Sequence, residues 1–336
     1  MLEAVANAGR DSGSQAVLSG AQFIAVPRGR WSYRNPAGEV AAAIGANGAI
    51  TALASVGVLQ QTLIGQACER IANGEIHTAL VTGADAGYRL LRARIAGREA
   101  SERDQDTAPD ISLAPKEELR HPIEKRAGLV MPVGLYAVLE SAYRAKHGWS
   151  VSEHRNRMAD ILGRCNRIAT QNPHAWNRNR IEPKAICEPS ERNPMQAFPY
   201  TRSHCSTWNV DQAAALLFCS AARAEELRIP RNRWIFPVAS TESNHMVAVS
   251  ARADLGGCPG AAITGKAALD AAGLEANVVE LVALCSCFPL ASEAYQDAVG
   301  LPLTRDETVT GGMPCAGGPY NNYVLQATCR AADLMR

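Results

Sequence analysis

The sequence predicts an α/β fold in which buried parallel strands alternate with helices. Short apolar runs rich in β-branched residues alternate with amphipathic segments in the first half of the chain, and the same alternation returns in the second half. The strand-like runs are apolar throughout, as in parallel strands that helices cover on both faces. A long polar segment separates the two halves. The sequence therefore predicts two α/β halves with an excursion between them.

The first half contains three predicted strands and three predicted helices. Residues 1–8 place their apolar side chains on one side and resemble the end of a helix. Pro36 predicts the start of a short helix, because proline suits the first helical position. The predicted strands are residues 21–26, 50–55 and 78–82, and the predicted helices are residues 1–8, 38–44 and 59–72.

The helix at residues 59–72 has the clearest pattern of the first half. Leu63, Ile64, Ala67 and Ile71 recur at helical spacing and form an apolar stripe, with polar residues opposite. Gly74 follows its last residues, and glycine commonly ends a helix because it adopts positive φ without strain. We expect this helix to pack on the strands that flank it.

The middle of the chain is polar and largely lacks strand patterns. Residues 99–124 are broken by prolines and predict a loop, and helical patterns follow at residues 133–146 and 152–170. Residues 172–199 are rich in proline, asparagine and arginine and predict an irregular segment, whose length in a compact domain suggests a function. We therefore divide the chain into residues 1–90, 91–200 and 201–336.

The second half repeats the alternation of the first. The predicted strands are residues 213–218, 234–239 and 278–284. The predicted helices are residues 220–227, 261–272, 289–299 and 320–335. A glycine-rich turn at residues 311–318 precedes the last helix.

The composition excludes several classes of protein. The net charge of +1 gives no reason to expect a nucleic acid or an anionic membrane as partner. No run approaches the ~18 apolar residues of a membrane span, and the first residues lack the basic start of a secretory signal. These features predict a cytoplasmic protein. The arginines at 89, 92, 94 and 98 form either a solvated helix face or a patch that attracts a phosphorylated ligand.

The ten cysteines predict neither disulfides nor a metal site. Most lie inside apolar elements, as reduced cytosolic cysteines do. No CxxC pair occurs, and the closest two are Cys285 and Cys287. Zinc sites built from cysteine usually need such a pair. We therefore expect no metal.

Several segments resemble the thiolase superfamily. Residues 59–85 are similar to the nucleophile helix of thiolases and the strand after it, and residues 211–220 are similar to the strand that opens their C-terminal half. Residues 311–323 (GGMPCAGGPYNNY) are similar to the glycine-rich turn of the family. The segments SCFP at 286–289 and AGGPYNNYV at 316–324 resemble a bacterial subgroup, the SCP2-thiolase-like proteins.

The resemblance covers roughly residues 20–336 and implies the thiolase fold. That fold has two similar βαβαβαββ halves packed as a five-layered αβαβα sandwich. Residues 91–200 would be the loop domain, which helps to hold coenzyme A. In this register the first strand of the family would precede Met1 and the last would follow Arg336, so the expected fold lacks both.

Thiolase chemistry needs a cysteine at a helix N-terminus, where the dipole lowers the pKa of the thiol, and a histidine that activates it. By the resemblance, the nucleophile position is Gly57 and the activating-histidine position is Gly318. The second, acid–base cysteine would lie beyond Arg336. The resemblance thus implies a protein of the acyl-CoA acyltransferase class, nominally an acetyl-CoA acetyltransferase, without ordinary cysteine-dependent activity.

Four residues are candidates for a relocated catalytic site. The resemblance implies that Cys285, Cys287 and Cys315 lie near the old catalytic centre, and Cys285 takes the place of a residue that helps to bind the oxyanion water. A cysteine of low pKa there would be a nucleophile, and His245 would be a base. The alternatives are that the cysteines are small apolar core residues and that His245 is an ordinary loop histidine.

Four further residues are candidates for substrate binding. Tyr320, Asn321 and Asn322 begin the last predicted helix, whose N-terminus would bind an anion or a carbonyl oxygen. The alternative is that an asparagine simply caps this helix. Asn244 lies in a loop where thiolases place polar residues of the binding site.

Three hypotheses remain. The first is a thiolase-like protein of lipid metabolism that binds a CoA thioester as substrate, with no covalently bound cofactor. The second is a non-enzymatic subunit or scaffold that pairs with a partner chain or with another copy of itself. The third is a non-functional relative of the thiolases.

Overall fold

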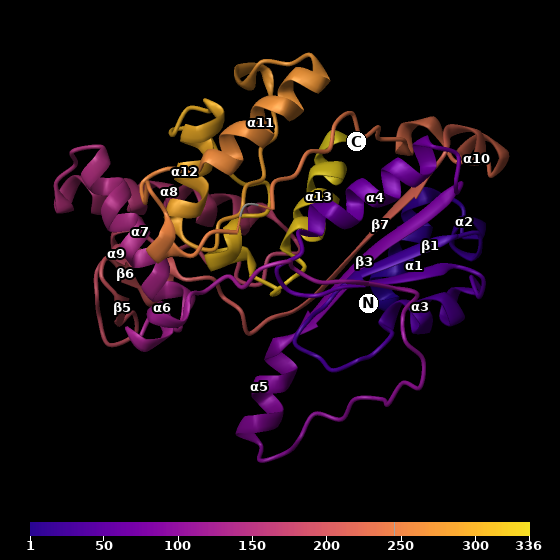
Figure 1. Ribbon diagram of the computed structural model, residues 1–336, viewed down its shortest axis with the longest axis horizontal. Coiled ribbons are helices and arrows are strands. Elements are labelled where there is room, and N and C mark those ends of the chain that lie inside the picture. The colour runs from indigo at the N-terminus through magenta and orange to yellow at the C-terminus, as the bar shows by residue number, and fades with distance from the viewer. Residues whose placement is uncertain (245) are drawn as a thin grey trace. The chain divides into compact units, whose positions relative to one another are not determined.

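The computed structural model describes residues 1–244 and 246–336, which form two compact units (Figure 1). Unit 1 comprises Met1–Pro115, Asn209–Glu242 and Pro319–Arg336, and unit 2 comprises Lys116–Trp208 and Ser243–Gly318. Each unit is therefore assembled from segments that lie far apart in the sequence.

Unit 1 contains a five-stranded sheet with the strand order β4-β2-β1-β3-β7. Neighbouring strands are parallel except for β3 and β7, which are antiparallel. The strands are β1 (Phe23–Pro27), β2 (Ile50–Ala54), β3 (Thr78–Ala86), β4 (Ile111–Leu113) and β7 (Asp211–Cys219). The ladder between β3 and β7 runs from Thr78 opposite Cys219 to Ala86 opposite Asp211. It joins the first part of the chain to a segment from its second half.

The helices of unit 1 are α1 (Leu2–Ser12), α2 (Ala16–Ser19), α3 (Pro36–Ile44), α4 (Gln60–Ala72), α5 (Gly87–Ile95), α10 (Ala221–Glu226) and α13 (Tyr323–Met335). They cover both faces of the sheet, as the continuously apolar strands require. Phe23 and Ala25 of β1 belong to a core shared with α4 and α13, whereas Ile24 and Val26, at alternate positions, belong to a core shared with α1 and α3.

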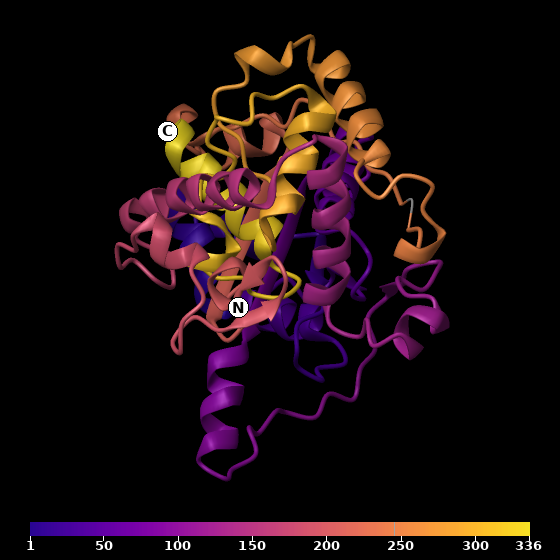
Figure 2. The same ribbon diagram turned by 90° about the vertical axis from the view of Figure 1, so that its left-hand side faces the viewer.

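The segment that follows β3 is partly anchored to the sheet. Figure 1 and Figure 2 show α5 projecting from the end of β3, and its first N–H groups are held by the carboxylate of Asp211. The arginines of α5 are exposed. Further along, the Asp110 carboxylate accepts hydrogen bonds from the Thr51 N–H and hydroxyl at 2.8 and 2.7 Å, which hold the pKa of Asp110 below its ordinary value. These bonds attach β4 to β2.

Unit 2 is mainly helical. Its helices are α6 (Pro122–Arg126), α7 (Pro132–Lys146), α8 (Val151–Gln171), α9 (Pro183–Cys187), α11 (Pro259–Ala272) and α12 (Pro289–Val299). Its two strands, β5 (Met195–Ala197) and β6 (Tyr200–Thr201), form a small antiparallel sheet. Met158 and Leu162 of α8 pack with Tyr200 and Phe288 in its largest apolar cluster. No helix in the described part of the chain has both the length and the apolar character needed to cross a membrane.

The α/β class and most predicted elements are confirmed. All three strands and all three helices predicted for the first half occur within a few residues of their predicted positions. In the later part of the chain, the predicted helices at 133–146, 152–170, 220–227, 261–272, 289–299 and 320–335 and the strand at 213–218 also occur. The strand at 213–218 belongs to the sheet of unit 1.

Two predicted strands are wrong. Residues 234–239 and 278–284 form no strand, so a second large sheet is absent from the part of the chain that the structure describes. In the first segment Pro237 lacks a backbone donor, and Phe236 and Val238 are 66% and 72% exposed. In the second segment Val278 is 57% exposed. Apolar composition predicted burial here, but neither segment has a neighbouring strand.

The core beneath α4 yields a stability prediction. Leu63 is fully buried against the sheet. We expect Leu63→Ala to lower the free energy of unfolding by about 2–5 kcal/mol, because it removes buried apolar surface and leaves a cavity. Chemical denaturation would measure this change. Leu334→Ala is the control, since Leu334 of α13 is 45% exposed and its loss should cost less than about 0.5 kcal/mol. Equal effects of the two substitutions would contradict the packing described above.

Candidate functional site

The turn before α4 in unit 1 has no room for a nucleophile. Gly57 adopts a φ of 102°, which side-chain-bearing residues rarely adopt. A Cβ atom at this position would lie 2.9 Å from Cγ of Pro115. The neighbouring Val56 and Val58 carry no nucleophilic group. Both the backbone conformation and the packing therefore favour glycine at the position where thiolases have cysteine.

In unit 2, Gly318 is closely packed. Its N–H donates to the Thr207 carbonyl oxygen at 2.9 Å, and a Cβ atom at Gly318 would lie 2.0 Å from Oγ of Ser206. A histidine at this position would need Ser206 to move. The position that the resemblance assigns to the activating histidine thus lacks the imidazole.

The start of α13 in unit 1 is bound by α4 rather than capped by its own asparagine. Gln60 accepts a hydrogen bond from the Val324 N–H at 2.8 Å through Oε1, and its Nε2 donates to Oδ1 of Asn321 at 2.9 Å. Asn322 occupies the N-cap position, yet its side chain makes no capping hydrogen bond. The simple capping role considered for these asparagines therefore does not describe Asn322.

The Asn322 amide is buried without a hydrogen-bond partner among the described residues. The residue is 2% exposed, and neither its Oδ1 nor its Nδ2 is paired. It packs directly on β3, since a Cβ atom at Gly83 would lie 2.3 Å from Oδ1 of Asn322. The Nδ2 of Asn321 is also unpaired. A buried amide without partners costs free energy unless water or a ligand satisfies it.

Tyr320 lies beside a buried ion pair. The Arg30 side chain donates to the Asp85 carboxylate at 2.9 Å through Nε, and the Arg30 backbone N–H donates to the same carboxylate at 3.0 Å. The Tyr320 ring centroid lies 5.8 Å from the Arg30 guanidinium carbon. Tyr320 has a φ of 49° and is 45% exposed. Positive φ in a tyrosine is a strained conformation of the kind found at functional sites.

Cys285 and Cys287 form a thiol pair in unit 2. Their Sγ atoms lie 3.7 Å apart, and Cys285 is exposed whereas Cys287 is half-buried. The hydrogen bond between the two thiols lowers the pKa of Cys285 to about 7 and raises that of Cys287 well above its ordinary value. The Cys287 charge also raises the pKa of the adjacent Tyr136. Cys285 is therefore the thiol of this pair that ionises first.

Cys315 lies in a different apolar cluster from this pair. It packs with Ile161 and Cys165, and its Sγ accepts a weak hydrogen bond from Nδ2 of Asn166 at 3.9 Å. Burial raises its pKa to about 11. This thiol is therefore un-ionised near neutral pH, as expected of a cysteine that fills core space.

Asn244 and His245 are the remaining two predicted site residues. Asn244 is an exposed residue of unit 2 whose backbone carbonyl oxygen accepts a hydrogen bond from Met246. His245 lies outside the described residues.

Solved structures of known proteins provide the comparison. No family model matches the sequence. A monomeric SCP2-thiolase-like protein type 1 from Mycobacterium smegmatis matches 96% of this chain with a TM-score of 0.73 and 25% identity. The chain spans 64% of the length of that protein.

Two further structures have lower identity. An Ltp2-ChsH2(DUF35) aldolase matches 97% of this chain and 82% of its own, with a TM-score of 0.67 and 16% identity. The Acat5 thiolase from Ascaris suum, solved in complex with coenzyme A, matches 100% of this chain and 86% of its own, with a TM-score of 0.65 and 15% identity.

This chain matches the thiolase fold, and its described residues form one large sheet of that fold. The resemblance to the thiolase superfamily is confirmed, and the match to an SCP2-thiolase-like protein agrees with the subgroup that the sequence indicated. Within this chain, positive φ and close packing disfavour a side chain at Gly57, and Gly318 carries no imidazole.

Sequence reasoning missed the residues that support the candidate site. Gln60 was counted only as part of a helix, and Arg30 and Asp85 were not singled out. Their roles arise from contacts between segments distant in the sequence, so no local spacing reveals them. The sequence offered one indication of this site, namely a basic and an acidic residue near the ends of two predicted strands. These are Arg30, after β1, and Asp85, in β3.

The crowding at Gly57 yields a prediction. We expect Gly57→Cys to destabilise the protein by about 1–3 kcal/mol, because it adds a side chain at positive φ against Pro115. It should not create thiolysis of acetoacetyl-CoA, since Gly318 provides no activating group. Gly74→Cys is a matched control, because Gly74 also has positive φ near α4 but has open space around it. Strong thiolysis by the Gly57→Cys variant would contradict this account.

The thiol pair yields a pH prediction. Because the pKa of Cys285 is lowered to about 7, its alkylation by iodoacetamide should rise with pH, reach half its maximum near pH 7 and level off above that. Mass spectrometry of the labelled peptide would measure the rate. Cys287→Ala removes the hydrogen bond and should move the midpoint up towards about pH 8.5, whereas Cys315→Ala should leave it unchanged. A wild-type midpoint near pH 8.5 would disprove the role assigned to Cys287.

Proposed function

We propose that this protein binds a CoA thioester and does not catalyse ordinary cysteine-dependent thiolysis or Claisen condensation. The observation that carries the proposal is the positive φ and close packing at Gly57, which disfavour a nucleophilic side chain, together with the glycine at position 318 in place of a histidine. Its nominal class remains acetyl-CoA acetyltransferase. As a handler of acyl-CoA it would act in the cytoplasm, in lipid metabolism.

The binding part of the proposal is supported by a neighbour and by unit 1. The similar Ascaris thiolase was solved with coenzyme A. In unit 1 the buried Asn322 amide offers an unused donor and an unused acceptor. We assign substrate binding to Tyr320, Asn321 and Asn322, where amides would hydrogen-bond the carbonyl groups of an acyl-CoA, and also to Asn244. Residues 91–200 would serve as the loop domain between the segments 1–90 and 201–336.

If the protein also acts on the bound thioester, Cys285 is our first choice of nucleophile. Its low pKa and exposure give it the thiolate that attack on a thioester requires. Cys287 would support it as its hydrogen-bond partner. His245 is the proposed base. Cys315 is the weakest of the proposed catalytic residues, because its pKa is raised by burial.

The second candidate function is a non-enzymatic subunit that assembles with a partner chain. One similar structure is a complex named for a DUF35 component. In the sheet of unit 1, β7 is an edge strand along its full length, and no strand in the described part of the chain pairs with its outer edge. An uncovered strand edge is a common site of association.

The binding proposal is tested by thermal unfolding with free CoA and with short-chain, long-chain and ring-bearing acyl-CoA esters. A ligand at about 100 times its Kd adds roughly 2.7 kcal/mol, which raises the Tm by a few degrees. We expect a rise that depends on the acyl group. Asn322→Ala should abolish it, whereas Asn47→Ala, at an exposed position of unit 1, should retain it.

Two outcomes would contradict the proposal. Acetoacetyl-CoA cleavage at the rate of active thiolases would disprove the loss of ordinary activity. No Tm change with any ester would disprove the binding proposal and favour the subunit. A mass measurement in solution would then test the subunit, since a monomer that captures no DUF35 protein would exclude that candidate.

A further inference from the structure

A closed cluster of ionisable side chains lies in unit 2, apart from the residues discussed above. Glu140 of α7, His154 of α8 and Glu293 of α12 are 0%, 2% and 0% exposed. One oxygen from each carboxylate and one ring nitrogen lie within 4.8 Å of one another. Two consecutive helices, α7 and α8, and the distant helix α12 thus bring three potential metal ligands to one point.

Glu140 is held in a fixed orientation. Its Oε2 accepts hydrogen bonds from the Tyr200 hydroxyl and from the Leu290 N–H, the latter at 3.1 Å. Its Oε1 lies 2.7 Å from Nε2 of His154. Outer hydrogen bonds of this kind orient a carboxylate that binds a metal ion and leave its other oxygen directed at the site.

Glu293 lacks the partners that a buried carboxylate needs. Neither of its oxygens has a hydrogen-bond donor among the described residues. Its ion pair with Arg157 is long, at 3.7 Å, and the Arg157 side chain is 34% exposed and stacks on Trp149. Tyr143 lies one turn after Glu140 on the same side of α7, and its buried hydroxyl is also unpaired. The cluster therefore contains unused oxygen atoms in a site closed to solvent.

We propose that Glu140, His154 and Glu293 bind one divalent transition-metal cation of the Zn²⁺ type. Two carboxylates and one imidazole suit Zn²⁺, and its double charge neutralises both carboxylates. Metal–ligand bonds of about 2.0–2.2 Å need only small side-chain movements from the observed spacing. The buried Tyr143 hydroxyl is a candidate for the fourth position. The bound ion would hold α7, α8 and α12 together as a structural site.

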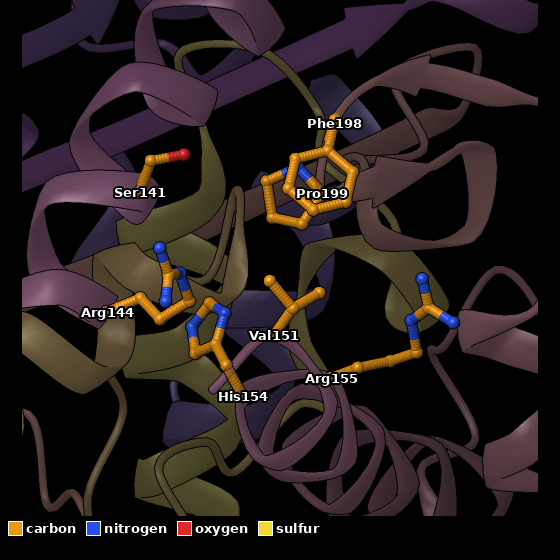
Figure 3. A pocket seen from close by; sticks show the side chains of 7 residues that line it. All are labelled: Ser141, Arg144, Val151, His154, Arg155, Phe198 and Pro199. Atoms are coloured by element: carbon orange, nitrogen blue, oxygen red, sulfur yellow. The ribbon is translucent and has the colours of Figure 1, made fainter. Parts of the chain in front are cut away.

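The cation would bind during folding rather than through an open channel. Figure 3 shows the small pocket beside His154, which is lined by Arg144, Arg155, Val151 and Phe198 among others. Two arginines at this opening repel a cation. The expectation that this chain has no metal was based on cysteine spacing. Cysteine spacing gives no information about a site whose ligands are two glutamates and a histidine from three helices.

The test measures zinc in the full-length protein. Wild type, Glu293→Gln and Asp297→Asn are expressed in zinc-supplemented medium, purified, and assayed by mass spectrometry for metal per chain. We expect about one zinc in the wild type and its loss in Glu293→Gln. Asp297 is the matched control on α12, because it is half-exposed and pairs with His147 instead. Asp297→Asn should keep the zinc.

A stability measurement separates this site from the ten cysteines, which also attract zinc. Wild type that is unfolded and refolded with a chelator should lose several degrees of Tm, and Glu293→Gln should be insensitive to the chelator. His154→Gln serves as the second variant if Glu293→Gln does not fold. The proposal is overturned if wild type, Glu293→Gln and Asp297→Asn contain equal amounts of zinc, or if none of them contains zinc. The absence of zinc from all three proteins would mean that Glu293 is buried as a neutral acid.

Discussion

Strand β3 is the element on which unit 1 depends, because it pairs with β1 along one edge and with β7 along the other. Residues 78–83 are buried on both faces. Such a strand suits apolar and small side chains, and the Thr82 hydroxyl donates to the Ala214 carbonyl oxygen. Gly83 supplies the small residue at the point where Asn322 approaches. Strand pairing and the candidate binding site are therefore parts of one packing arrangement.

At the two positions that the resemblance assigns to thiolase catalytic residues, this chain has glycine, and each glycine has close neighbours. At Gly57 the backbone is in the positive-φ region and Pro115 fills the adjacent space, while at Gly318 the space belongs to Ser206. Restoring one catalytic side chain would thus require local rearrangement of the chain around it. A fold can keep its strand order and helical layers while its catalytic turns change in this way, because turns carry little of the buried core.

The sequence predicted the first half of the fold because its signals are local. An apolar run such as residues 78–82 and a stripe such as Leu63, Ala67 and Ile71 report burial directly. Residues 234–239 carried the same apolar signal but form no strand, because composition reports the tendency to be buried and says nothing about a pairing partner. The contacts of Gln60 with Asn321, and of Glu140 with His154, join separate helices. No periodicity in one sequence encodes such contacts.

The thiols of this chain differ in pKa because their surroundings differ. This difference singles out one pair of thiols as the candidate for chemistry on a thioester. Burial raises the pKa of seven cysteines, which are Cys68, Cys165, Cys187, Cys205, Cys219, Cys315 and Cys329. At the exposed Cys285 the hydrogen bond with the neighbouring thiol lowers the pKa instead. Thiolases obtain their thiolate from a helix dipole, whereas this thiol obtains it from a side-chain donor two residues away. In our proposal, covalent chemistry on a thioester depends on the Cys285–Cys287 pair, and the turn before α4 has a conformational role.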